Sequence, residues 1–174
     1  MRATSLTVAA LAAALLLTGC DDGGDGGDGK DSKAGSACAA KLSVRFGPAN
    51  AAPAAGDTGN VPVTITNGGD AECTLDGLPA VEFDAGDTVS AIGADEAAGV
   101  KKTTLAKGVS TSLTLTYVRG EGGGTKSLAV RRVKIDLPGG GAQHTFKWSY
   151  GDVALKSDGQ TPDASLTGFQ RSGD

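Results

Sequence analysis

Apolar and polar residues alternate along most of the chain after residue 40, with a period of two residues. In the clearest run, from Val109 to Tyr117, apolar side chains occupy most odd positions and Ser or Thr occupies the even ones. Successive side chains of a strand point to opposite faces, so this period is typical of strands with one buried face. The same alternation, punctuated by Gly, Pro and Asn, predicts further strands at 41–46, 61–66, 81–83, 89–92, 101–105, 128–137 and 144–150.

Some positions within and after these runs carry expectations of their own. Pro62 has no N–H for a ladder, so its strand is predicted to be an edge strand or to begin near Pro62. The apolar positions of 128–137 change from even to odd at Arg131-Arg132, which predicts a β-bulge. Val153 and Leu155 are expected to extend the strand at 144–150 or to pair with it. The polar segment beyond residue 156 is expected to be loose, with Phe169 as its one anchor.

Short strands at this spacing, with no helical period after the first 20 residues, predict an all-β domain at 37–156 and a polar C-terminal tail at 157–174. The pattern favours an immunoglobulin-like β-sandwich of about seven or eight short antiparallel strands.

The first 20 residues have a different pattern. A single charge at Arg2 precedes an apolar run at 6–17, which ends in Leu17-Thr18-Gly19-Cys20. The run is shorter than the roughly 20 residues of a membrane-spanning helix and suits the apolar core of a signal peptide. Its ending resembles the bacterial lipobox, so residues 1–19 are predicted to be a lipoprotein signal peptide, with Cys20 the acylated first residue of the mature protein. An ordinary secretory signal with a chance cysteine is the alternative.

Residues 20–36 are predicted to form a flexible tether, since Gly, Asp, Ser and Lys offer nothing to a core. Lipid on Cys20, such as palmitate, would make the membrane a partner of the protein. The predicted location is therefore the outer face of the bacterial cytoplasmic membrane, with the domain held clear of the lipid headgroups.

Cys38 and Cys73 remain once Cys20 carries lipid. Export places them in an oxidising compartment, which favours a disulfide between them. The chain-entropy model gives the loop that this bridge closes about 3.5–4 kcal/mol of stabilisation. The alternative is a two-thiol metal site, but a single histidine and the lack of Cys-x-x-Cys argue against it. We expect no metal and no cofactor.

Charge and motifs narrow the function classes. The net charge is −4, with 16 Lys and Arg against 20 Asp and Glu, so no basic surplus points to nucleic acid. The sequence has no nucleophile-elbow, zinc-protease or phosphate-loop motif. His144, the only histidine, is interpreted as structural because it shares a strand face with aromatic residues. The chain is therefore predicted not to be an enzyme, and no residue is assigned a catalytic role.

Two groups of residues are candidates for an interaction surface. Phe146, Trp148 and Tyr150 share one face of a predicted strand, where they form either part of the core or an exposed aromatic platform for a sugar or a protein. Arg131 and Arg132, with Lys134, form a small basic cluster that is either a solvated strand face or a site for an anionic partner. The candidate surface residues are thus Trp148, Tyr150, Arg131 and Arg132.

The chain from Cys38 onward also resembles a family of exported domains called domain of unknown function 4232, common in lipoproteins of high-GC bacteria. The resemblance covers roughly 37–155, and its specific part is the first third. The sequence departs from the family pattern at Leu78, where the family usually has an aromatic residue, and at Ala80, where it usually has Gly. It also lacks the third domain cysteine that the family has late in the chain. It implies a β-sandwich, usually lipid-anchored, with no established activity and no catalytic residue. The residues that carry it are Cys38, Leu42, Val44, Ala54-Ala55-Gly56, 63–67, 73–81 and the turn at 105–110.

The leading hypothesis is a lipid-anchored cell-envelope protein whose β-sandwich is a non-catalytic interaction module for an envelope protein or glycan. A structural envelope protein without a discrete ligand is the second hypothesis, and a cell-wall hydrolase is the third and weakest.

Overall fold

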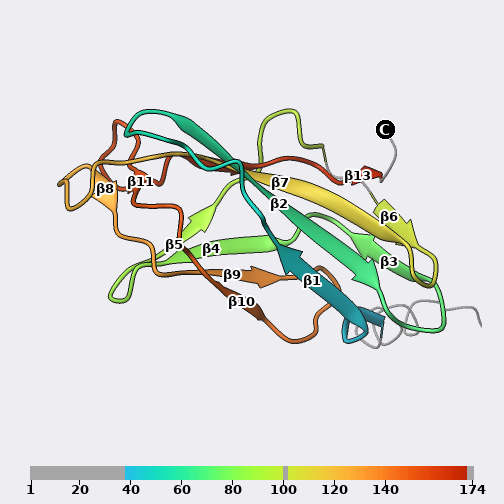
Figure 1. Ribbon diagram of the computed structural model, residues 1–174. Coiled ribbons are helices and arrows are strands. Elements are labelled where there is room, and N and C mark those ends of the chain that lie inside the picture. Colours follow the sequence, from blue (N-terminus) through green and yellow to red (C-terminus); the bar gives the residue numbers. More distant parts are fainter. Residues whose placement is uncertain (1–37, 100–101, 172–174) are drawn as a thin grey trace, which may run out of the picture.

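The computed structural model describes residues 38–99 and 102–171, and the predicted signal peptide, tether and Cys20 lie outside this part. The described chain is all-β, with a single helical turn at 38–39 before the first strand (Figure 1). No helix within these residues is long and apolar enough to cross a membrane. The strands are β1 Leu42–Phe46, β2 Thr58–Asn67, β3 Cys73–Asp76, β4 Ala80–Asp84, β5 Val89–Ile92, β6 Lys102–Leu105, β7 Ser110–Val118, β8 Ser127–Leu128, β9 Arg132–Asp136, β10 His144–Lys147, β11 Val153–Ala154, β12 Ala164–Leu166 and β13 Gln170–Arg171.

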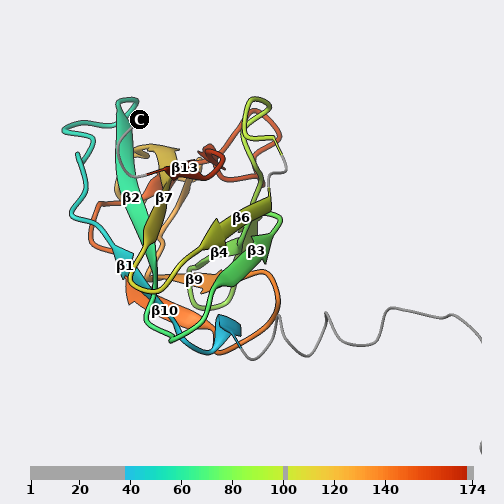
Figure 2. The same cartoon turned by 90° about the vertical axis from the view of Figure 1, so that its right-hand side faces the viewer.

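Two main sheets make up the body of the domain. One has the order β1-β2-β7-β12, with β13 also paired to β7, and the other has the order β10-β9-β4-β5. All pairings between these strands are antiparallel. Two small sheets, β3-β6 and β11-β8, lie at opposite ends of the body (Figure 1). Figure 2 shows the β3-β6 pair from its own end of the body. The all-β prediction is confirmed, and the two main layers are consistent with a β-sandwich.

The predicted alternation fills the core between these layers. On β2 the side chains of Val61, Val63 and Ile65 are at most 1% exposed, and their polar neighbours are half-buried. The inward residues of β7, β4 and β9 follow the same period. Burial of alternate apolar side chains is the main source of stability for such a layered fold. The inward residues of those three strands are Leu113, Leu115, Tyr117, Val81, Phe83, Val133 and Ile135.

The prediction for Pro62 is wrong, because β2 is a central strand that begins at Thr58. The backbone of Pro62 faces β1, where its carbonyl oxygen accepts a hydrogen bond of 2.9 Å from the N–H of Gly47. Gly47 is the residue that follows β1, so the missing N–H of Pro62 points to the place where the neighbouring strand has ended. A proline is tolerated inside the sheet for this local reason.

The bulge predicted at Arg131-Arg132 is instead a break between two sheets. β8 pairs with β11, and β9 pairs with β4 and β10, so the chain changes sheets between Leu128 and Arg132. The N–H of Arg131 bonds to the carbonyl oxygen of Asp84, and the carbonyl oxygen of Arg131 accepts from the N–H of Trp148. The change of phase in the apolar pattern therefore marks a change of partner strands.

The C-terminal tail is part of the domain, contrary to the predicted boundary at 156. β12 and β13 both pair with β7, and the side chain of Leu166 is only 2% exposed. Phe169 packs against the core, as expected of an anchor. Val153 pairs with Leu128 of β8 rather than with the strand at 144–147.

Other differences concern the strand count and its limits. The described residues hold thirteen strands rather than seven or eight. β3 was missed because its two buried positions are Cys73 and Leu75, so only one aliphatic side chain marks the alternation. Val109 precedes β7 and is 46% exposed, so this strand begins one residue later than the predicted run from Val109 to Tyr117.

The predicted disulfide is present and ties the start of the domain to β3. Cys38 and Cys73 are joined, with a Cα–Cα distance of 5.4 Å, and the side chain of Cys73 is completely buried. Ala39 lies beside Gly141 in the loop between β9 and β10. The chain thus joins the body at the end that holds β3, β6 and the β9–β10 loop, which we call the proximal end.

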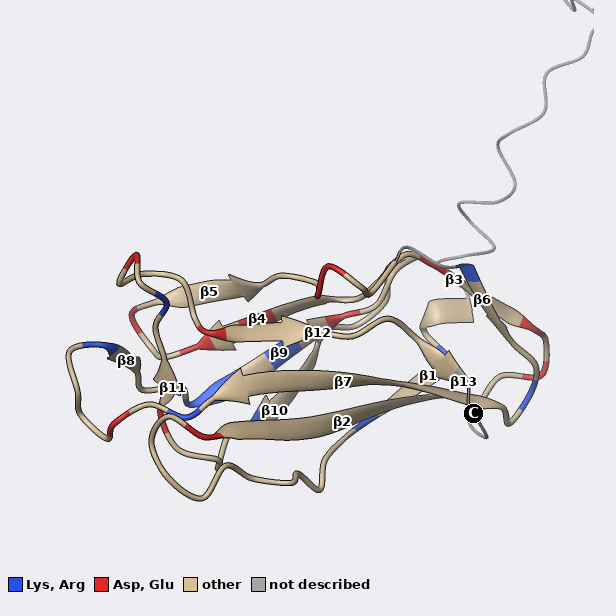
Figure 3. Ribbon diagram, turned by 90° about the horizontal axis from the view of Figure 1, so that it is seen from above, with Lys and Arg blue, Asp and Glu red and all other residues tan. Residues whose placement is uncertain are grey.

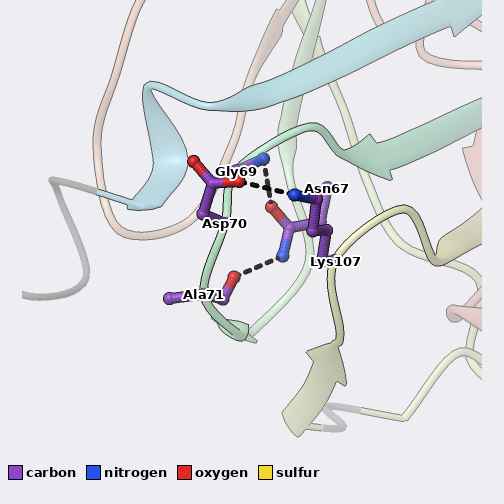
Figure 4. Close-up of polar contacts among 5 residues, drawn as sticks. All are labelled: Asn67, Gly69, Asp70, Ala71 and Lys107. Atoms are coloured by element: carbon purple, nitrogen blue, oxygen red, sulfur yellow. Dashed lines mark hydrogen bonds and ion pairs between the residues drawn. The ribbon is translucent and has the colours of Figure 1, made fainter.

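A buried asparagine holds the loops of the proximal end together (Figure 4). The side-chain N–H groups of Asn67, which is 1% exposed, donate to the carbonyl oxygens of Ala71 and Leu105, both at 2.8 Å. Its side-chain oxygen accepts from the N–H of Gly69 at 2.9 Å. An exposed ion pair between Lys107 and Asp70 lies beside this network. Asn67 therefore connects the β2–β3 loop to the end of β6.

Candidate functional site

Six aromatic residues form one cluster along the inner side of β10 and the segment after it. Trp148 is 5% exposed, and its ring centroid lies 4.9–5.0 Å from those of Phe83, Tyr117 and Tyr150. Its indole N–H donates to the carbonyl oxygen of Gly151. Edge-to-face packing of this kind, with the polar atom bonded, is typical of a core aromatic residue. The exposed-platform interpretation is wrong for Trp148, and the core interpretation is confirmed.

Tyr150 is half-buried at the margin of the same cluster. Its backbone carbonyl oxygen accepts a hydrogen bond of 3.3 Å from the hydroxyl of Tyr117, and that hydroxyl in turn accepts from the N–H of Ala52. Phe46 stacks on Phe146 with 5.4 Å between ring centroids. These contacts join the margins of the two main sheets, so the aromatic cluster serves the packing of the layers.

The basic candidates lie on the other face of the same sheet. Arg132 and Lys134 alternate on β9 with the buried Val133 and Ile135, so their side chains point away from the core. In Figure 3 the blue of β9 lies beside the red of β4. Lys134 forms an ion pair of 3.1 Å with Asp84, and the two side chains are only 24% and 13% exposed. Lys134 is therefore neutralised within the sheet.

Asp84 is held in its ionised form at this position. A hydrogen bond from the backbone N–H of Gly86 lowers the pKa of Asp84 below its ordinary value of 3.8, and the hydrogen bond from Lys134 lowers it further. The carboxylate thus interacts with Lys134 and Arg132 on β9 and with the backbone of the β4–β5 turn.

Three other cations form no ion pair among the described residues, although the charge of Arg132 also helps to lower the pKa of Asp84, which lies opposite it on β4. Arg131, Arg132 and Lys147 are exposed, and none takes part in the ion pairs of residues 38–99 and 102–171. Arg132 is directly opposite Lys147 in the β9–β10 register. The guanidinium of Arg131 lies against Gly86, at a distance that leaves little room for a side chain at that position. We call Arg131, Arg132 and Lys147 the cationic corner.

A cavity of about 520 Å³ lies near the start of β2 and the end of β7. Its size is within the range of ligand sites, roughly 300–1,000 Å³. The guanidinium of Arg119 is fixed beside it by hydrogen bonds to the carbonyl oxygens of Ala52 and Pro53, at 2.9 and 2.8 Å. Lys126 and Glu121 are exposed at its rim. The cavity is lined by Ala55, Gly56, Arg119, Gly120, Glu121, Gly124, Thr125, Lys126, Ser127, Ala154 and Leu155.

Gly120 lets the walls of the cavity come together. A Cβ atom at Gly120 would lie 2.3 Å from the hydroxyl oxygen of Ser127 and 3.0 Å from the backbone nitrogen of Ala154. Any other residue would force β8 and β11 away from the end of β7. The Gly-rich sequence of 120–124 thus has a packing role in addition to making a turn.

The cavity and the cationic corner lie at the same end of the domain. The N–H of Arg119 bonds to the carbonyl oxygen of Asp57 just before β2, while Asn67 at the other end of β2 contacts the proximal loops. The ten residues of β2 place about 30 Å between these ends. The backbone N–H of Trp148 donates to the carbonyl oxygen of Arg131, and the ring of Trp148 packs on Tyr117 near the end of β7. We call this region, with β8 and β11, the distal end (Figure 1).

Sequence reasoning missed the distal cavity because its walls come from separate segments that show no common motif. It did find Arg131 and Arg132, but not their relation to Lys147. That relation depends on the β9–β10 register, which the loop at 137–143 sets. The change of the apolar positions from even to odd near Arg131 was the only sign in the sequence that the strand there is interrupted.

Two other titratable side chains that the structure describes, His144 and Asp158, lie apart from the cavity and the cationic corner. His144 is half-buried on β10 opposite Ile135. No group of three or more His, Cys, Asp or Glu side chains suited to a metal ion occurs among the residues that the structure describes. Asp158 has its pKa lowered to about 2, first by the hydroxyl of Thr161 and then by backbone N–H groups, within a single turn. The hydrogen bonds of the Asp158 side chain therefore all stay within this turn.

A model of a protein family described as "Domain of unknown function (DUF4232)" matches residues 38–170. The match includes the strands β12 and the first residue of β13, in agreement with their packing on β7. A search of curated proteins finds no match to the chain.

Proposed function

The chain belongs to the family called domain of unknown function 4232, and from that premise we propose that it is a lipid-anchored cell-envelope protein with a non-catalytic binding module. In this proposal Cys20 carries the lipid, residues 20–36 form the tether, and the domain is an immunoglobulin-like sandwich. The lipobox-like ending Leu17-Thr18-Gly19-Cys20 supports the anchor. The Cys38–Cys73 disulfide supports an extracytoplasmic location, because such bonds persist in oxidising compartments.

The observation that carries the binding function is the distal cavity of about 520 Å³. It lies at the opposite end of the domain from Cys38, where the tether would join. A ligand bound there would meet the protein at the end that lies opposite the attachment point of the tether. Rigid strands with binding loops at one end are a common arrangement for recognition domains.

The anchor is tested by the intact mass of the mature protein purified from its own membranes. We expect the mass of residues 20–174 plus two or three acyl chains, less two protons for the disulfide. An unlipidated mass that begins at another residue would refute the anchor and make the protein a secreted one.

The binding function is tested by recovery of partners from envelope extract on the immobilised full mature chain. Thr125→Trp places a large side chain at an exposed position of the cavity lining. Ala71→Trp is the matched control, since Ala71 is exposed at the proximal end. We expect Thr125→Trp to lose the partner or glycan and Ala71→Trp to retain it. Recovery of nothing by the unchanged protein, or equal recovery by both variants, would contradict the proposal.

A further inference from the structure

The cationic corner is an electrostatically unfavourable arrangement for the isolated domain. Arg132 and Lys147 are directly opposite each other on neighbouring strands, and like charges in that position are destabilising. Arg131 adds a third positive charge, since it precedes Arg132 and its carbonyl oxygen accepts a hydrogen bond from the backbone N–H of Trp148, the residue after Lys147. Asp84 is opposite Arg132 on the other side of β9, but its carboxylate is bonded to Lys134 and to the N–H of Gly86. Arg131 and Lys147 therefore have unused capacity to bind an anion, and Arg132, whose charge acts on Asp84 without forming an ion pair, keeps part of its own.

From these contacts we propose that the cationic corner binds a polyanionic polymer of the cell envelope that carries phosphate groups along its chain. Two of the three residues are arginines, whose planar guanidinium groups bind phosphate oxygens in a bidentate manner. The proposal rests on the proposed function, since it names the class of partner that an envelope binding module would meet.

The shape of the site favours a chain-like ligand over a small molecule. Arg131, Arg132 and Lys147 line neither the distal cavity nor the smaller cavity of about 280 Å³ between 95–98 and 167–170. They lie on the outward side of a sheet and at its margin, where an extended polymer can contact several cations in succession. A small ligand would have no walls to enclose it.

The position of the site favours a polymer over lipid headgroups. Arg132 and Lys147 lie at the open end of the β9–β10 hairpin, whereas Ala39 lies against Gly141 in the loop that closes the other end. The segment that precedes Ala39 leads to the predicted anchor. The cationic corner therefore lies at the end of the domain opposite the segment that would lead to Cys20.

The charge of the whole protein makes this proposal easy to test. A net charge of −4 repels a polyanion, so binding must come from a local group of cations. The test variant replaces Arg131, Arg132 and Lys147 with Gln. The control variant replaces three exposed lysines elsewhere, Lys41, Lys102 and Lys107, with Gln, and so has the same net charge.

Binding of the full mature chain to poly(glycerol phosphate) is measured by fluorescence anisotropy at low and moderate salt. We expect the test variant to bind about 100-fold more weakly, because it loses three cations that contribute similar shares of the affinity. The control variant is expected to bind much as the unchanged protein does. Affinity of the unchanged protein should fall as salt rises, and the test variant should show a smaller salt dependence. Equal losses in the two variants would overturn the proposal, as would equal binding of uncharged dextran.

Vesicles that contain phosphatidylglycerol, at equal total phosphate, separate the polymer from the membrane. Tighter binding to vesicles than to the polymer would overturn the assignment to a polymer. Circular dichroism melting checks that the variants fold. Lys147→Gln alone is expected to melt no lower than the unchanged protein, because it removes the like-charge pair and leaves Arg132 opposite Asp84. If the test variant still recovers its envelope partner while poly(glycerol phosphate) fails to bind, the inference fails and the proposed function stands.

Discussion

Replacement of Asn67 by Ala tests whether a single buried amide holds the proximal loops together. The change removes two donated hydrogen bonds, to the carbonyl oxygens of Ala71 and Leu105, and one accepted bond from the N–H of Gly69. The backbone bonds of Asn67 itself, to Val109 and Gly108, remain. The side chain is 1% exposed, so water has little access to the groups that lose their partner.

The expected loss follows from these three bonds. A hydrogen bond contributes about 1 kcal/mol net, and a buried group left without a partner costs about 1–3 kcal/mol. We therefore expect Asn67→Ala to lower the free energy of unfolding by about 3 kcal/mol. For a domain of this size that corresponds to a fall of roughly 10 °C in melting temperature. Thermal and urea unfolding, followed by circular dichroism with the disulfide intact, measure both quantities.

Two controls make the result specific. Asn60 accepts one side-chain hydrogen bond, from the hydroxyl of Thr116 at 2.9 Å, so Asn60→Ala should cost about one third as much. Lys107→Ala removes only the exposed ion pair beside Asn67, whose side chains are 68% and 95% exposed, and should have little effect. A loss for Asn67→Ala no larger than that for Asn60→Ala would refute the reasoning.

Further predictions concern the disulfide, the C-terminal strands and one carboxylate. Reduction of the Cys38–Cys73 bond should lower the free energy of unfolding by about 3.5–4 kcal/mol, and equal melting temperatures with and without reductant would contradict this. Leu166→Ala should cost about 2–5 kcal/mol because its side chain is 2% exposed, and a loose tail would instead show no effect in urea unfolding. The pKa of Asp158 is about 2 in the folded protein, so its stabilising effect should be present above pH 4 and be lost as pH falls toward 2. Thr161→Val should raise the pKa of Asp158 toward 3.8, as measured by carboxyl NMR titration, and an unchanged pKa would show that the hydroxyl is not its cause.

The sequence by itself determined the local properties of the chain. Period-two alternation was sufficient to identify β1, β2, β4, β7 and β10, because a half-buried strand imposes that period on its own residues. The pairing of Cys38 with Cys73 followed from a count of cysteines, once Cys20 was set apart. The expectation of an anchor at Cys20 also comes from the sequence alone, and it stays a prediction.

Only the tertiary structure decided which strands are neighbours and what lies between them. The strand of Pro62 was predicted to be an edge strand or to begin near Pro62, because sequence does not show where β1 ends relative to β2. Leu166 was assigned to a loose tail because a three-residue strand has too few positions to show a period, yet β7 offers it a partner and a buried site. The distal cavity and the pairing of Arg132 with Lys147 depend on register and on loops far apart in the chain. Such contacts are set by packing of the whole domain, because hydrogen bonding and burial act between segments that share no local pattern.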